Sequence, residues 1–177
     1  MTVLIISSAM YGMTMKIADL LDEHGLKWFK GSAMLFGLAW GIFGLIFALT
    51  NEVTGTLVLA MNIAFILRGR LDYPNHQLAA TIIILGILYN PSSVIPNLLI
   101  VFFLIFLVFG GLKDVIDDTF KLKSRAKVLT ESMLYYPIPT FLLCYFFGYD
   151  WTTFWGFLTA VFFYNTTKLI FGNKGYC

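Results

Sequence analysis

Acidic and basic residues gather in three short polar segments of a chain that is otherwise strongly apolar. The segments are Lys16–His24, Arg68–His76 and Lys113–Asp118. In the first segment, Asp19 and Asp22 lie three positions apart, which places them on one face of a helix. Asp114 and Asp117 repeat this spacing in the third segment. Because like charges so placed repel each other, each pair favours a nearby cation.

A hard divalent cation is the partner that such carboxylate pairs suit. Mg²⁺ takes oxygen ligands, usually one or two carboxylates together with phosphate oxygens of a substrate. Arginine or lysine nearby can bind the remaining phosphate oxygens. The same residues allow a simpler interpretation, in which loop carboxylates solvate an interface and form weak exposed ion pairs. The pattern Asp-x-x-Asp-Glu returns as Asp-x-x-Asp-Asp 95 residues later, and this repetition keeps the metal hypothesis open.

Apolar helices must position these segments. Of the 177 residues, 59% are apolar and 12% are charged, and the mean hydropathy is +0.81, so lipid is the expected solvent. A membrane-spanning helix needs roughly 20 apolar residues. Six segments meet or approach that length: Ala33–Thr50, Val53–Leu67, Gln77–Tyr89, Pro96–Leu112, Ser132–Tyr149 and Trp151–Phe171. We therefore predict an all-α, polytopic transmembrane helical bundle that forms a single integral membrane domain over residues 1–177.

The N-terminal run Val3–Ala18 is a candidate seventh span. Two serines, a glycine and a threonine interrupt its apolar character. The run could cross the membrane, re-enter it, or lie along the interface as an amphipathic helix. We accordingly treat residues 1–31 as an apolar or interfacial helix with an acidic-basic loop, and residues 32–177 as a six-helix transmembrane bundle.

The placement of the basic residues predicts an orientation in the membrane. When the loops are numbered alternately, all twelve Lys and Arg residues fall on one side of the bundle. The turns on the other side contain neither residue type: Asn51–Glu52, Asn90–Ile95 and Tyr149–Asp150. Cytoplasmic loops collect basic residues, so we expect the basic loops and the C-terminus to be cytoplasmic.

Two aspartate-rich motifs at the cytoplasmic ends of helices, four spans apart, resemble the arrangement in UbiA-type intramembrane prenyltransferases. Residues 113–118, Lys-Asp-Val-Ile-Asp-Asp, are similar to that family's second motif, in which spaced aspartates hold Mg²⁺ against a prenyl diphosphate. Asp19 and Asp22 match the Asp-x-x-Asp core of the first motif, whereas Ala18 stands in place of the expected asparagine. The later aspartate and the Pro-rich continuation are missing, and the chain is shorter than that nine-helix fold.

The resemblance implies an enzyme that ionises an allylic diphosphate, with Mg²⁺ as its cofactor. The implied metal ligands and catalytic residues are Asp19, Asp22, Asp114, Asp117 and Asp118. The cations that would neutralise the leaving group are Arg68, Arg70 and Lys113. Aromatic side chains would face the allylic cation, namely Phe36, Trp40, Tyr135 and Tyr136.

Three further polar residues complete the candidate substrate-binding set: Asn62, Asp72 and His76. Asn62 lies inside an apolar span, where a polar residue usually faces the bundle and either marks a site or bonds across helices. His76 could contact a phosphate or could simply begin a helix at the interface.

Proline and glycine positions predict how the helices bend and meet. Pro137 and Pro139 lie within the fifth expected span and should kink it. Gly37, Gly41 and Gly44 place small residues along one face of the first clear span, which indicates a close helix contact.

Two other functions fit the same sequence. A small transporter or channel would line a water-filled path with Asn62 and the bend at Pro137. A non-catalytic scaffold would splay the three polar segments apart to meet a soluble partner or anionic lipids. An enzyme requires the segments to converge on one cleft. We expect membrane lipids and a prenyl or other lipid diphosphate as partners, and no nucleic acid; the chain is also compatible with a homo-oligomer.

Overall fold

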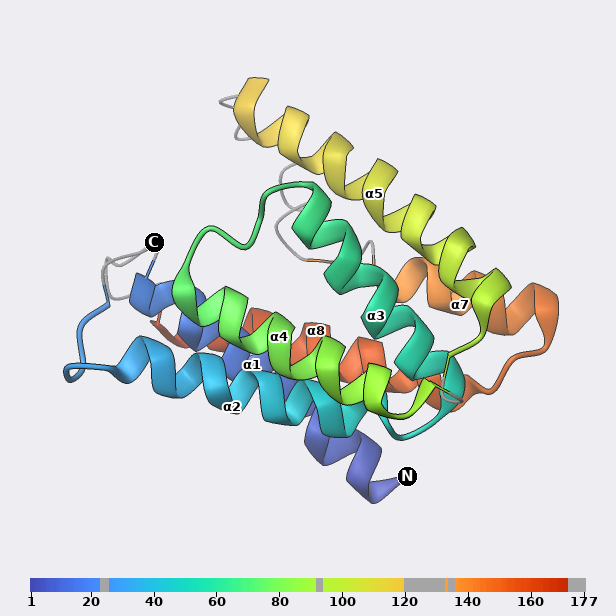
Figure 1. The fold of residues 1–177 in the computed structure, drawn as a ribbon, viewed down its shortest axis with the longest axis horizontal. Coiled ribbons are helices and arrows are strands. Elements are labelled where there is room, and N and C mark those ends of the chain that lie inside the picture. The colour runs from blue at the N-terminus through green and yellow to red at the C-terminus, as the bar shows by residue number, and fades with distance from the viewer. Residues whose placement is uncertain (23–25, 92–93, 120–132, 134–135, 172–177) are drawn as a thin grey trace.

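A computed structural model of the chain describes residues 1–22, 26–91, 94–119, 133 and 136–171, with the backbone alone for residues 116–119. These residues form seven helices and no strand, which confirms the all-α prediction (Figure 1). The helices are α1 (Thr2–Asp22), α2 (Ser32–Ala48), α3 (Glu52–Leu67), α4 (Pro74–Tyr89), α5 (Pro96–Thr119), α7 (Pro137–Phe147) and α8 (Trp151–Phe171).

Two of the described helices are long and apolar enough to cross a membrane, judged by length and composition. They are α1 and residues Pro96–Val115 of α5. Helices α2, α3 and α7 are apolar but shorter, with 17, 16 and 11 residues. A helix of 17 residues rises only about 26 Å, against a hydrocarbon core of about 30 Å. The structure therefore supports a membrane association, and the count of six spans stays a prediction.

Helix α1 lies inside the bundle rather than on its surface. It packs against α2 on one side and α8 on the other. Ala18 and Leu20 of α1 are fully buried, and most of the helix is enclosed. Gly12 permits the crossing with α8, because a methyl group there would overlap the carbonyl oxygen of Ala160. Helix α1 therefore belongs to the same core as the later helices, and whether it crosses the membrane stays a prediction.

The glycine face predicted for α2 is confirmed. Gly37 lies against the backbone of Asn75, at the start of α4, and Gly41 lies against Ala79, one turn further along. A side chain at either position would collide with α4. These glycines let α2 and α4 approach closely, and that approach brings the first turn of α4 up to α1.

Helices α5 and α7 lie at the edge of the bundle. Helix α5 packs on α3, whereas α7 packs on α8, so the two edge helices have different supports. The kink expected at Pro137 and Pro139 is wrong, because α7 begins at Pro137. Proline is tolerated there, since the N–H groups of a first helical turn have no partner within the helix.

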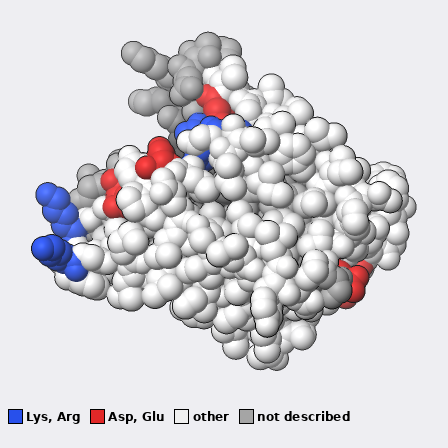
Figure 2. Space-filling model, in the orientation of Figure 1, with Lys and Arg blue, Asp and Glu red and all other residues white. Residues whose placement is uncertain are grey.

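The two ends of the bundle differ in charge. On the face shown in Figure 2, basic side chains lie only at one end, together with carboxylates, and a separate acidic patch marks the opposite end. At that opposite end, uncharged groups join α3 to α8: the hydroxyls of Thr54 and Thr153 lie 3.1 Å apart, and Thr153 donates to Asn51 Oδ1 at 3.2 Å. Thr152 donates its backbone N–H to the carboxylate of Asp150 at 2.9 Å, which holds the pKa of that carboxyl below its usual range.

The contact at Gly12 gives a test of the packing. Gly12→Ala should lower the free energy of unfolding by about 1–3 kcal/mol, because α1 and α8 must separate to admit the methyl group. Gly111→Ala on α5 is the matched control, since a Cβ there meets nothing within 4 Å and alanine is the better helix former. Reversible unfolding in detergent would measure both variants, and a Gly12→Ala protein as stable as the control would contradict the assigned crossing.

Candidate functional site

A polar cavity of about 160 Å³ lies at the basic end of the bundle. All three polar segments contribute to its lining. The first lies on α1, the second in the link between α3 and α4, and the third on α5. Its polar lining consists of Asp19, Trp40, Arg68, Arg70, Asp72, His76, Lys113, Tyr136 and Tyr164. Met15, Phe65, Leu71 and Met133 complete the wall. We call this space the polar cavity.

Asp19 is the carboxylate at the centre of the first group of contacts. Tyr164 of α8 donates its hydroxyl to Asp19 Oδ2 at 2.9 Å. His76 Nε2, from α4, lies 3.3 Å from Asp19 Oδ1. Lys16 Nζ lies 3.9 Å from Oδ2, and the same ammonium sits 5.2 Å from the centre of the Tyr164 ring. A carboxylate carried into the bundle by α1 thus accepts a hydrogen bond from α8 and lies beside an imidazole ring from α4.

His76 is held in the first turn of α4, which begins with Pro74 at a position where proline is favoured. The His76 ring meets the edge of Trp40 with centroids 5.4 Å apart, and its Nδ1 lies 3.9 Å from Asp72 Oδ1. The neighbouring Asn75 donates its side-chain amide to the carbonyl oxygen of Ala18 at 3.1 Å, which fixes this turn against α1. His76 therefore stands between two carboxylates on a rigid support.

Asp114 forms the second group of contacts, where two arginines share one carboxylate. Arg68 donates Nε and Nη2 to Asp114 Oδ2 at 2.9 and 2.7 Å. Arg70 pairs with the other oxygen, Oδ1. Charge-assisted bonds of this kind are about twice as strong as neutral ones. Only 8% of the Arg68 side chain is exposed, against 45% for Arg70, so Arg68 holds the structure together while Arg70 faces the opening.

Gly110 makes room for the buried arginine. A side chain at that position would overlap the Arg68 guanidinium, whereas a side chain at Gly111 would meet nothing within 4 Å. The guanidinium also lies 5.8 Å from the ring centre of Phe65, one turn earlier on α3. Arg68 is thus seated against α5 by a glycine, an aromatic ring and a carboxylate.

The structure brings most of the predicted site residues together. Those that line the polar cavity are Asp19, Arg68, Arg70, Asp72, His76 and Lys113, and Asp114 lies behind them as the partner of both arginines. Asp22 at the end of α1 does not line the cavity. Asn62 is buried in α3, also away from the cavity, and donates to the carbonyl oxygen of Val58 at 2.8 Å. The side chains of Asp117 and Asp118 lie outside the described residues.

Of the aromatic walls implied by the resemblance, Trp40 and Tyr136 do line the polar cavity. Phe36 instead packs edge-on against Trp28, with ring centroids 5.3 Å apart, and Tyr135 lies outside the described residues. Sequence reasoning placed Lys16 in the first polar segment but missed Tyr164, because both roles depend on how α8 meets α1. Their contribution could be recognised only once that pairing was known.

The described residues do not fit the expected Mg²⁺ site. Within them, no three His, Cys, Asp or Glu side chains stand together in a way that could hold a metal ion. Both oxygens of Asp114 already face arginines, Asp19 Oδ2 accepts from Tyr164, and Asp19 Oδ1 lies 3.3 Å from His76 Nε2. The described cavity wall carries three Arg or Lys side chains and two carboxylates, and a third carboxylate, Asp114, pairs with both arginines from behind.

No protein-family model, curated protein or solved structure matches the chain at a significant level. The likeness to UbiA-type prenyltransferases, together with its metal, therefore stays a prediction from short motifs.

Removing the shared carboxylate should destabilise the fold. Asp114→Asn leaves the buried guanidinium of Arg68 without its counter-ion, which we expect to lower the free energy of unfolding by about 3 kcal/mol. Asp22→Asn, at the second aspartate of the other motif, should change it by less than about 0.5 kcal/mol. Chemical unfolding in detergent micelles measures both, and equal effects would show that the pairing in the structure is not the source of the stability.

A second substitution removes the same ion pair without altering any charge. Gly110→Ala should force the Arg68 guanidinium away from Asp114 and lower the free energy of unfolding by about 1–3 kcal/mol. In an Asp114→Asn background most of this loss should vanish, because the contact is already broken. Gly111→Ala serves as the control. Additive effects of Gly110→Ala and Asp114→Asn would contradict the proposal that Gly110 makes room for the contact between Arg68 and Asp114.

Proposed function

We propose that this chain is an integral membrane protein whose polar cavity binds the phosphate or diphosphate head group of a lipid, and that it is an enzyme acting on that group. The observation that carries the proposal is the convergence of three polar segments, distant in sequence, on one cavity. A scaffold would let these segments splay apart. An enzyme or a specific lipid-binding site requires them to meet.

The exposed surface supports a membrane setting. Ile100, Leu104, Val108 and Leu112 of α5 form an exposed apolar stripe with a spacing of one helical turn. Exposed apolar residues continue over α2, α7 and α8. Soluble monomers rarely expose continuous apolar surface of this extent, whereas lipid tails would cover it. We propose that the shorter helices also cross the bilayer, with local thinning to match their length.

The charge distribution supports an orientation with the polar cavity at the cytoplasmic face. The described basic side chains Lys27, Lys30, Arg68, Arg70 and Lys113 lie in or beside the segments at the cavity end. Basic residues are retained on the cytoplasmic side during insertion. A cavity there is also within reach of the head groups of lipids in that leaflet.

The size and lining of the cavity support a head group as its ligand. A volume of about 160 Å³ is below the 300–1,000 Å³ typical of pockets for whole drug-sized ligands. Arg70 and Lys113 carry donors suited to phosphate oxygens, and they would neutralise charge that develops on a departing phosphate or diphosphate. His76 also lines the cavity, with its ring nitrogens 3.3 Å from Asp19 and 3.9 Å from Asp72.

Nothing in the described residues favours the transporter hypothesis over this one. Asn62, which was expected to line a path, donates its side-chain amide to the carbonyl oxygen of Val58 in its own helix. The bend expected at Pro137 is replaced by a helix start.

Binding of inorganic pyrophosphate to the purified protein in lipid nanodiscs tests the proposal. The Arg70→Gln, Lys113→Gln double variant should bind pyrophosphate at least ~10-fold more weakly, because each lost charged hydrogen bond is worth about 1.5–3 kcal/mol. Lys27→Gln, Lys30→Gln is the matched control, since these exposed lysines lie at the same end of the bundle but outside the polar cavity. The control should bind within about twofold of the unaltered protein, as expected for exposed charges away from the ligand.

Two results would count against the proposal. Absence of pyrophosphate binding would remove the head-group site, and equal weakening in both double variants would reduce the effect to surface charge. Repeating the titration with and without Mg²⁺ addresses the metal separately: binding that needs Mg²⁺ would support the carboxylate motifs, and binding without it would assign the affinity to the cations of the cavity.

A further inference from the structure

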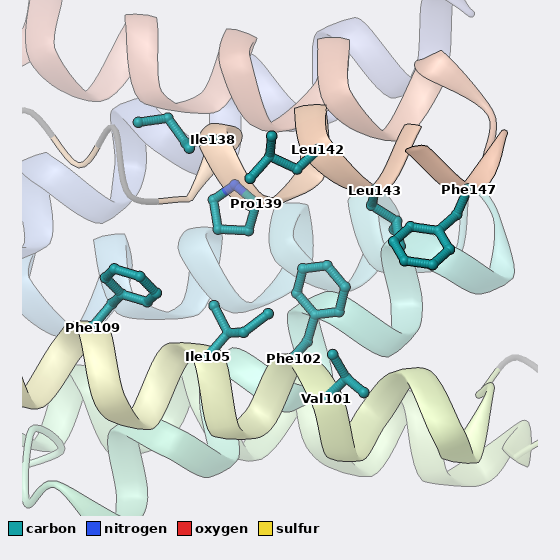
Figure 3. A pocket seen from close by; sticks show the side chains of 9 residues that line it. All are labelled: Val101, Phe102, Ile105, Phe109, Ile138, Pro139, Leu142, Leu143 and Phe147. Carbon is teal, nitrogen blue, oxygen red and sulfur yellow. The ribbon is translucent and has the colours of Figure 1, made fainter. Parts of the chain in front are cut away.

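We infer that the apolar groove between α5 and α7 holds the hydrocarbon chain of the same lipid whose phosphate occupies the polar cavity. This inference rests on the proposed function and adds a second subsite to it. The groove has a volume of about 270 Å³ and is walled entirely by apolar side chains (Figure 3). From α5 come Val101, Phe102, Ile105 and Phe109, and the facing wall is contributed by α7.

The groove exists because its two walls rest on different helices. Helix α5 is held by α3, and α7 by α8, so the edge helices face each other across a gap instead of interlocking. Figure 3 shows Pro139 and Leu142 of α7 opposite Ile105 and Phe102 of α5, with open space between them. The start of α7 at Pro137 sets the position of this wall.

The groove leads to the polar cavity along α5. Phe109 lines the groove and Lys113 lines the cavity, and these residues are one helical turn apart on the same face of α5. A row of aromatic rings lies between the groove and the polar cavity. Phe106 lies 5.7 Å from Phe102, on the groove side, and 5.5 Å from Tyr136, on the cavity side, measured between ring centroids.

This continuity identifies the occupant. An entirely apolar groove offers no hydrogen bonds to water, so hydrocarbon is its natural filling. A lipid held by its phosphate at Lys113 would have its first carbons near Phe109 and the following ones between α5 and α7. From Val101 to Phe109 the groove follows about 12 Å of the helix axis, which is enough to grip several carbons and to distinguish a long chain from a short one.

Chain-length dependence tests this subsite. Dissociation constants for butyl phosphate, dodecyl phosphate and inorganic pyrophosphate would be measured in nanodiscs of one lipid composition. Ile105→Trp fills the groove from α5, and Ile138→Trp fills it from α7. Leu104→Trp is the matched control, because this neighbour is 51% exposed and does not line the groove. All four proteins partition dodecyl phosphate into the same lipid, so differences between them report the groove.

The unaltered protein and Leu104→Trp should bind dodecyl phosphate at least ~10-fold more tightly than butyl phosphate, as expected for burial of several methylene groups. Ile105→Trp and Ile138→Trp should lose this gain and keep their affinity for pyrophosphate. If both groove variants bind pyrophosphate and retain the full gain, the inference is wrong and the head-group proposal stands. If none of the proteins binds pyrophosphate, the proposed function fails and the inference fails with it.

Discussion

The carboxylate of Asp114, shared by Arg68 and Arg70, is the interaction on which the rest of the site depends. Helix α5 packs mainly on α3, and this charged contact fixes the end of α5 against the end of α3. It thereby sets the position of Lys113, and through the same helix it sets one wall of the apolar groove. Because the pair is largely removed from water, its geometry matters more than that of a surface ion pair. Gly110 is the residue that permits it.

Asp19 is a buried carboxylate at the same end of the bundle. A carboxylate on a helix enclosed by apolar neighbours is costly unless donors surround it. Tyr164 of α8 donates to it, and the ring of His76 from α4 lies 3.3 Å away, so contacts of one carboxylate bring α1, α4 and α8 together. The close approach of α2 and α4 at Gly37 contributes, because it lets Asn75 reach α1 beside this group. Packing of small residues and satisfaction of a buried charge therefore reinforce each other.

Much of this arrangement could be predicted from local pattern, and the remainder could not for definable reasons. Apolar segments and turn residues indicated the helices, and the glycine spacing indicated the face of α2. The loop order placed the three polar segments at one end, and left open whether they converge or splay apart. The pattern did not predict which residues would pair: Asp114 binds arginines of another segment, and Asn62 donates to a carbonyl oxygen of its own helix. Pro137 was misplaced because proline fits a first turn as well as a kink.

Ion pairs join the helices at one end of the bundle, and uncharged hydrogen bonds join them at the other. Near the polar cavity the helices are joined by charged groups, whereas Thr54, Thr153 and Asn51 join α3 to α8 at the far end through uncharged hydrogen bonds. Dissolved ions screen the half-exposed contact of Arg70 with Asp114 more than the buried contact of Arg68, and they leave the uncharged hydrogen bonds largely unaffected. The cavity end of the bundle is therefore sensitive to ionic strength, whereas the uncharged hydrogen bonds at the far end hold α3 and α8 together at any salt concentration.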